Sequence, residues 1–323
     1  MAINSKITLC FGVIDEVDLI SHFIDYHLEL GIDTFIGTDV GSTDGTLDIL
    51  SQYERRGCLR LLRRSDPTAL VDWQSPMLEI ARQDNPCGWG LFCDADEFWI
   101  LPTTNCRDYF SAAAAPVMRL SRYNMVPQRG EHRTEVAHFT AFDLVVKRPL
   151  KFGYRINAID DPDHLRDLRG GYPPEILRAI APKVAARVDV AVAIVPGFHD
   201  VITATGASER EPENTGYIAH FPVRSAKQWR RKAELVARFM EANPPHKNPY
   251  FGGHWVRLAE IFKLGLIEED FWRQVLTSKA VAGYVRDGTL VRDSTLAHRF
   301  ASMSSRIRSD HERSRLSSWR SDC

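Results

Sequence analysis

The sequence predicts an α/β protein with a mixed, mostly parallel sheet that is flanked by helices and followed by a helical C-terminal region. Two observations predict this class. In the first hundred residues, short apolar segments typical of buried strands alternate with amphipathic segments, and only a few residues join them. Alternation with short joints is typical of parallel strands whose connecting helices cover the sheet.

The elements of the first hundred residues are predicted in chain order. Residues 7–14 and 33–38 are apolar and rich in β-branched side chains, so each is predicted to be a strand. Residues 17–30 carry apolar side chains at helical spacing, and Gly31 follows as a residue that ends a helix. The next segments are predicted as a helix at 46–53, a strand at 58–62, a helix at 71–82 and a strand at 89–93.

The strand predicted at 89–93 leads directly into three carboxylates, Asp94, Asp96 and Glu97. Burial of an unpaired carboxylate is costly, so we expect Asp94 and Asp96 at the strand end, facing a cation or strong donors. Two carboxylates in an Asp-x-Asp turn suit a divalent cation that keeps open positions for diphosphate oxygens. On this motif alone, the simpler interpretation that the acids only cap a turn or a helix stays open.

Other acidic residues are predicted to share the edge of the sheet with these carboxylates. Ligands of open α/β sheets bind beyond the carboxyl ends of the strands. Asp15 and Glu16 follow the first predicted strand, and Asp39 ends the second. We therefore expect all of them to lie beside Asp94 and Asp96.

Four stretches of the chain resemble a known family. Residues 14–33 contain I-D-E and then F-I-D-Y-H-L-E-L-G-I-D, residues 39–46 read D-V-G-S-T-D-G-T, and residues 91–98 read L-F-C-D-A-D-E-F. Residues 220–232 contain H-F-P-V-R-S, followed by a glutamine and a lysine. In this order and spacing, the stretches resemble glycosyltransferase family 2 in the broad sense that includes relatives with a D-A-D-E-F signature.

This resemblance implies a GT-A fold and a division of the chain. Residues 1–101 would form the half that binds a nucleotide-sugar, and residues 102–223 the half that binds the acceptor and completes the metal site. Residues 224–323 would form a C-terminal helical region and a basic tail. Two positions depart from the family's pattern: Asp15 stands where Asn is expected, and Val40 where Asn or Asp is frequent.

The resemblance also implies roles for the acidic residues. Asp39 would hydrogen-bond the nucleobase or ribose, and Asp94 would face the ribose or the water shell of the metal. Asp96 would ligate Mn²⁺ or Mg²⁺, which bridges the diphosphate. Asp15 and Glu16 would line the nucleotide site. Asp94 and Asp96 are thus the predicted catalytic pair.

Basic residues of the fourth stretch are the predicted partners of the metal and the diphosphate. Arg224 and Lys232 could reach diphosphate oxygens, although a surface salt bridge is the simpler interpretation for Lys232. His220 would complete the metal shell beside Asp96. A buried histidine bonded to a backbone carbonyl is the alternative for His220, and it is favoured for His199.

The predicted function is a metal-dependent glycosyltransferase of the hexosyltransferase type. It would move a sugar from a nucleotide-diphosphate sugar, with UDP favoured by the resemblance, to a glycan or lipid-linked acceptor in polysaccharide biosynthesis. One alternative is an aspartyl-phosphate phosphatase with Asp94 as nucleophile and Asp96 as acid/base, although that motif usually lies on the first strand. Another is a protein that binds a nucleotide-sugar or glycan without turnover.

The composition limits the classes of partner and the cellular location that we expect for this protein. The 41 Lys and Arg residues against 42 Asp and Glu give a net charge of −1, so we expect no nucleic-acid partner. Six scattered cysteines without a C-x-x-C pair, no signal peptide and no run of about 18 apolar residues predict a cytoplasmic enzyme. The Ser/Arg tail at 304–323 is predicted as a solvated or disordered segment. Weak peripheral contact with anionic lipid at the inner face of the membrane is the alternative.

The second half of the chain is less regular. We predict strands at 135–147 and 183–195 and a loop at 160–174. Ser225 and Gln228 form a capping box that begins a helix extending to about residue 240. Further helices are predicted at 256–266 and 271–276. Trp99 is predicted to be a core residue, and stacking on a sugar ring is the alternative.

Overall fold

The computed structural model describes residues 6–69, 72–129, 135–152, 172–204, 216–243 and 253–303. The loop predicted at 160–174 lies almost entirely outside these residues, and the tail predicted at 304–323 lies entirely outside them. Within the described part of the chain, no helix has both the length and the apolar character needed to cross a membrane.

A six-stranded sheet forms the centre of the fold, with strand order β3-β2-β1-β4-β9-β6. Four adjacent strands pair in parallel: β1 (Ile7–Val13), β2 (Thr34–Asp39), β3 (Leu59–Arg63) and β4 (Trp89–Asp94). The antiparallel strand β9 (Lys183–Arg187) pairs with β4, and β6 (Val117–Leu120) pairs with β9. The predicted class, a mixed and mostly parallel sheet flanked by helices, is confirmed.

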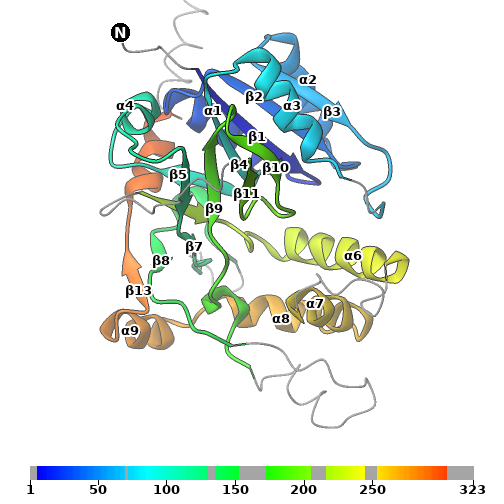
Figure 1. Ribbon diagram of the computed structural model, residues 1–323. Helices are drawn as coiled ribbons and strands as arrows, with labels where there is room; N and C mark the ends of the chain where they lie inside the picture. The colour runs from blue at the N-terminus through cyan, green and yellow to red at the C-terminus, as the bar shows by residue number, and fades with distance from the viewer. Residues whose placement is uncertain are drawn as a thin grey trace, which may run out of the picture.

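Helices cover both faces of this sheet (Figure 1). Side chains of α1 (Ile20–Glu29) and α2 (Thr46–Arg55) join the odd-numbered side chains of β1 in one core cluster. Side chains of α3 (Ser75–Asp84) pack on Cys10 and Phe92, on the opposite face. The alternation follows from the period of two along a strand, which places successive side chains on opposite faces.

Three smaller sheets join the central sheet in the described part of the chain. The three-stranded sheet consists of β5 (Glu97–Ile100), β12 (Tyr217–His220) and β7 (Arg122–Asn124), with β12 in the middle. Its register places His220 beside Glu97 on one side and beside Asn124 on the other. Two further pairs join β8 (Leu144–Val146) to β13 (Leu290–Arg292) and β10 (Ala191–Ile194) to β11 (Val201–Thr203). The β10–β11 pair packs with α3 on one face of the central sheet.

The predicted helical C-terminal region is confirmed. Figure 1 shows its helices gathered below the sheet, away from α1, α2 and α3. They share a second core cluster with β8 and the short helix Glu175–Leu177. These helices are α6 (Ala226–Ala242), α7 (Gly253–Lys263), α8 (Ile267–Gln274) and α9 (Ser278–Arg286). The remaining helices include α4 (Cys106–Ser111), the turn Phe139–Ala141 and a segment at 295–303. The boundaries predicted at residues 101 and 223 stay predictions.

Two strand predictions in the second half are wrong in extent. Within 135–147 only β8 is a strand, because a 3₁₀ turn at Phe139–Ala141 directs both Phe139 and Phe142 into the core. The segment 183–195 divides into β9 and β10. A turn separates them, in which Val190 N–H donates to the Arg187 carbonyl and Asp189 pairs with the Arg187 side chain.

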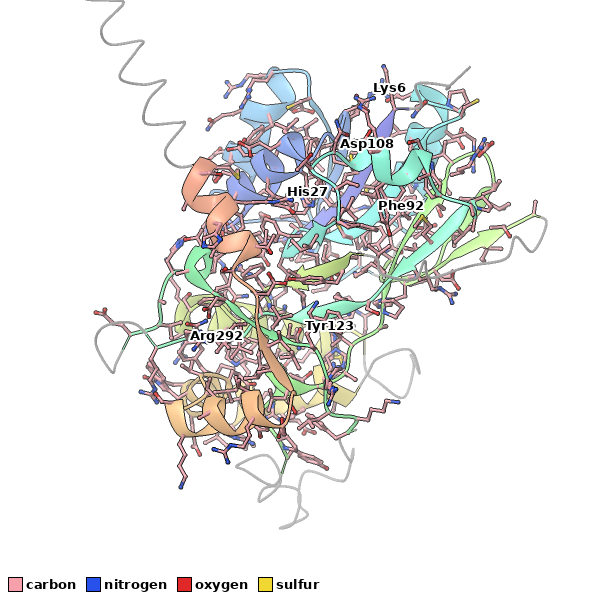
Figure 2. All side chains as sticks on the ribbon, turned by 90° about the vertical axis from the view of Figure 1, so that its left-hand side faces the viewer. Lys6, His27, Phe92, Asp108, Tyr123 and Arg292 are labelled. Carbon is pink, nitrogen blue, oxygen red and sulfur yellow. The ribbon has the colours of Figure 1, made fainter. Side chains whose placement is uncertain are left out.

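The core between α1 and β5 contains a neutral histidine. His27 is fully buried; its Nδ1–H donates to the Phe23 carbonyl at 2.8 Å, and its Nε2 accepts from Trp99 N–H at 3.3 Å. Figure 2 shows His27 and Phe92 inside the upper half of the molecule, whereas Tyr123 and Arg292 lie in the lower half. Trp99 is also fully buried, which confirms it as a core residue. Burial lowers the pKa of His27 to about 3.

We predict that His27→Gln flattens the dependence of stability on pH. Between about pH 6.5 and pH 3 the unfolded chain binds a proton at His27 that the folded chain does not. As the pH is lowered through this window, the free energy of unfolding of the wild-type protein should therefore fall by about 1.4 kcal/mol per pH unit. His27→Gln should lose that contribution to the slope. Urea unfolding at pH 7, 6 and 5 measures both slopes. Each protein is compared with its own value at pH 7, so lost packing cancels, and parallel slopes would contradict the prediction.

Candidate functional site at the carboxyl edge of the sheet

The three acids after the fourth strand occupy different environments. β4 ends at Asp94, Ala95 and Asp96 form a tight turn, and Glu97 begins β5. The Asp94 side chain is 43% exposed, the Asp96 side chain is 6% exposed, and Glu97 is fully buried. The prediction that Asp94 and Asp96 lie at the strand end is confirmed, but the strand formed by β5 was not predicted.

Glu97 is held from three directions by this chain. Its Oε2 accepts the Asp94 backbone N–H at 2.9 Å and lies 3.3 Å from Lys183 Nζ. Its Oε1 pairs with the guanidinium of Arg122. Burial acts to raise the pKa of Glu97, but the charges of Lys183 and Arg122 outweigh it and lower that pKa below its ordinary value. Glu97 therefore fixes the turn as a buried anion.

Lys183 is a fully buried cation at the start of β9. Its Nζ lies 2.6 Å from Asp94 Oδ2 and also donates to the Gly197 carbonyl at 2.8 Å. Lys183 thus joins Asp94 to Glu97 and sets the direction of the Asp94 carboxylate. One local signal pointed to Lys183, because a lysine begins a segment that otherwise has the apolar pattern of a buried strand.

Asp96 faces two nitrogen groups from the C-terminal half. His220 Nε2 lies 3.4 Å from Asp96 Oδ2, and Lys232 Nζ lies 3.5 Å from the same oxygen. Burial acts to raise the pKa of Asp96, but His220 in its protonated form and the charges of Lys232 and Arg224 hold it well below its ordinary value. One ligand atom each from Asp96, Glu97 and His220 lies within 4.8 Å of the others.

Asp39 ends β2 and is buried beside the glycine turn. Its Oδ2 accepts the backbone N–H groups of Gly41 at 3.3 Å and Ser42 at 3.2 Å. Its Oδ1 is buried and has no hydrogen-bond donor among the residues that the structure describes. A buried acceptor without a donor is costly, so this oxygen would gain a hydrogen bond from any donor group that reached it.

Asp15 connects three elements at the same edge. Its backbone has a φ of 54°, in the left-handed region, and its Oδ1 accepts Thr43 N–H at 2.7 Å. Its Oδ2 accepts from Arg231 Nε on α6 at 2.8 Å. The aspartate that stands where Asn was expected therefore carries a charge that Arg231 neutralises.

Arg224 is buried and uses its guanidinium within the chain. It pairs with Glu16, donates from Nε to Asp18 Oδ2 at 2.8 Å, and donates to the Phe221 carbonyl at 2.7 Å. Burial acts to raise the pKa of Glu16, and the adjacent charge of Arg224 acts to lower it and favours the ion pair. Arg224 and Glu16 hold the loop after β1 against the start of α6. The side chain of Ser225 caps this helix by accepting Gln228 N–H, as the capping box predicts.

Most of the predicted site residues thus meet at one edge. Asp94, Asp96 and His220 surround the turn after β4, while Asp15, Glu16 and Arg224 form ion pairs that join the loops to α6. His199 is hydrogen-bonded to the Pro182 carbonyl, which agrees with the interpretation of His199 as a structural histidine. Sequence reasoning missed the residues Asn124, Arg122 and Arg231, for which no local pattern gave a signal.

Comparison with known proteins gives no family. No family model matches the chain, and no curated protein sequence matches it. Among solved structures, Staphylococcus aureus TarS residues 1–349 in complex with UDP is similar, with 11% identity, a TM-score of 0.37, and coverage of 88% of this chain and 92% of that chain. GalNAc-T7 with UDP, GalNAc and Mn²⁺ is also similar, with 11% identity, a TM-score of 0.38, and coverage of 88% and 57%. Likeness at this level shows neither a family nor an activity.

We predict that Lys183→Met destabilises the fold far more than Lys232→Met. Loss of the Lys183 charge leaves Arg122 as the one cation that pairs with buried Glu97 among the described residues and removes the partner of Asp94, and breaking a buried pair costs about 3–5 kcal/mol. Lys232 is 34% exposed, so its removal should cost less than about 1 kcal/mol. Chemical denaturation of both variants measures the difference, and equal losses would show that Lys183 does not stabilise the turn.

Proposed function

We propose that this chain is a metal-dependent glycosyltransferase that transfers a sugar from a nucleotide-diphosphate sugar to a glycan or lipid-linked acceptor. The observation that carries the proposal is the pair Asp96 and His220, whose ligand atoms lie 3.4 Å apart at the carboxyl edge of a mostly parallel sheet. The order of the four sequence stretches that resemble family 2 glycosyltransferases supports the same function.

The donor set fits a divalent cation with Asp96 and His220 as its protein ligands. Oxygen and imidazole nitrogen together suit Mn²⁺ better than Mg²⁺, which prefers oxygen. Glu97 lies close enough to join, but Lys183 and Arg122 already occupy its two oxygens. Few protein ligands leave open positions for a diphosphate. When bound, the ion would act as a Lewis acid that neutralises charge on the leaving diphosphate.

The chain's own cations would assist at the diphosphate. Lys232 Nζ lies 3.5 Å from Asp96 on a partly exposed side chain, so it can turn toward a phosphate oxygen beside that carboxylate. Arg224 was expected at the diphosphate as well, but its buried guanidinium is bonded to Glu16, Asp18 and the Phe221 carbonyl, so it would support the site by holding these residues in place. Asp94, partly exposed and oriented by Lys183, would accept a hydrogen bond from the ribose.

Asp39 would select the nucleobase. Its unpartnered Oδ1 can accept a hydrogen bond from the imino N–H of uracil, whereas cytosine presents an acceptor at that position. Asp15 and Glu16 would shape the walls of the nucleotide site through their pairs with Arg231 and Arg224. UDP is therefore the proposed nucleotide.

We predict that release of UDP from UDP-sugars requires Mn²⁺ or Mg²⁺ and the Asp96 carboxylate. EDTA should abolish the release, and Asp96→Asn should lower it by about 100-fold or more, because metal stabilisation of the leaving group contributes several kcal/mol. Asp189→Asn, in the remote turn after β9, is the matched control and should leave the release unchanged.

The alternatives give different results in the same assay. Undiminished release in EDTA would eliminate the metal role. Binding of UDP-sugars without release would favour the non-catalytic alternative, and turnover of an aryl phosphate would favour the phosphatase.

We predict that Asp39→Asn weakens UDP binding while the fold keeps its stability. An asparagine can retain one oxygen for the N–H groups of Gly41 and Ser42, but it places an amide group where Oδ1 was. The loss should be about 1–3 kcal/mol, or roughly 5- to 150-fold in Kd, and binding of CDP should improve relative to UDP. Isothermal titration with both nucleotides and a thermal melt test this, and unchanged UDP affinity would leave Asp39 with a turn-capping role only.

A further inference from the structure

We infer that Asn124 is a positioning residue that fixes His220 in the tautomer with hydrogen on Nδ1 and a free lone pair on Nε2, facing Asp96. This inference deepens the proposed function, on which the metal role of the pair rests. It is carried by the hydrogen bonds of a single buried amide.

The orientation of the Asn124 amide follows from its two partners. Asn124 lies on β7 and is only 4% exposed. Its Nδ2 lies 2.9 Å from the Ile176 carbonyl oxygen, which can only accept, so the amide nitrogen must face Ile176. Its Oδ1 then faces His220 Nδ1 at 2.7 Å.

This orientation decides which ring nitrogen of His220 carries hydrogen. The Asn124 Oδ1 atom can only accept, so His220 Nδ1 must donate to it. In the neutral ring Nε2 then has a lone pair, and it lies 3.4 Å from Asp96 Oδ2, another acceptor. Two acceptors cannot hydrogen-bond each other, but they can share a cation.

The opposite tautomer would make Asp96 and His220 partners in a hydrogen bond instead of two acceptors. With hydrogen on Nε2, His220 would donate to Asp96 and the two side chains would form an ordinary structural hydrogen bond. Asn124 therefore distinguishes a ligand pair from a structural histidine. Histidine ligands of metals commonly donate their second ring N–H to such an oriented partner.

The support of Asn124 extends into the helical region. Ile176 N–H donates to Gln274 Oε1 at 3.0 Å, and Gln274 Nε2 donates to the Asp270 carbonyl at 3.2 Å. Asp270 Oδ2 in turn accepts from Trp229 Nε1 on α6 at 3.0 Å. A continuous series of buried hydrogen bonds thus links α6 and α8 to the ring of His220.

The test is the tautomer of His220 in the whole protein, freed of metal with EDTA. Long-range ¹H–¹⁵N correlation spectra identify which ring nitrogen carries hydrogen, at a pH where the ring is neutral, and His220→Gln assigns the signals. We expect the Nδ1–H form in the wild-type protein. Predominance of the Nε2–H form would overturn the inference without the need for any variant.

Two variants separate positioning from structural support. Asn124→Leu removes the acceptor for Nδ1 and should shift His220 toward the Nε2–H form, with about 10- to 100-fold weaker binding of Mn²⁺. Asn124→Asp also loses the bond to Ile176 but keeps an acceptor, so it should retain the Nδ1–H form. If both variants lose the Nδ1–H form equally while thermal melts show that they are folded, the positioning role is wrong.

The outcome for the metal is separate from the outcome for the tautomer. Titration of Mn²⁺ alone into the wild-type protein measures the affinity of Asp96 and His220 for the ion directly. Absence of Mn²⁺ binding would contradict the proposed function, and the tautomer spectrum would still decide the role of Asn124.

Discussion

The buried charge of Glu97 is the constraint on which the arrangement of the site depends. A carboxylate removed from water is costly unless opposite charges and hydrogen bonds surround it. Here Lys183 comes from β9, Arg122 from β7 and the Asp94 N–H from β4, so one side chain holds together strands of the central and the three-stranded sheets. The turn between β4 and β5 is fixed by this carboxylate, and Asp94 and Asp96 take their places from the turn.

The fold distributes its charges so that the two acids of the turn differ. Lys183 faces Asp94 from below the surface and leaves that carboxylate partly exposed, whereas Asp96 is buried between His220 and Lys232. Asp15, Glu16 and Asp18 are balanced by Arg231 and Arg224 from the α6 region. The edge of the sheet thus carries a frame of ion pairs that joins the loops after the parallel strands to α6.

Much of the fold could be predicted from local sequence, because β1 to β4 are short apolar runs and α1 and α2 have helical spacing beside a glycine, whereas α3 was patterned less clearly and begins later than predicted. The acids after β4 were predicted for the same reason. β5 was missed because it begins at Glu97, one of the carboxylates themselves, and its apolar part, Phe98 to Ile100, is only three residues long. Lys183 and Asn124 could not be placed, since they meet Asp94 and His220 across about 90 residues of chain, and pairing over that distance leaves no periodic pattern.

The position of β9 between β4 and β6 has a consequence for synthesis of the chain. Glu97 leaves the ribosome 86 residues before Lys183, which at about 5–20 residues per second is a delay of roughly 4–17 s. During that interval the strand that carries the acids has a free edge, and its future interior carboxylate has no lysine to neutralise it. The edge of β4 therefore gains its partner strand only when β9 inserts, and the neutralising lysine arrives with that strand.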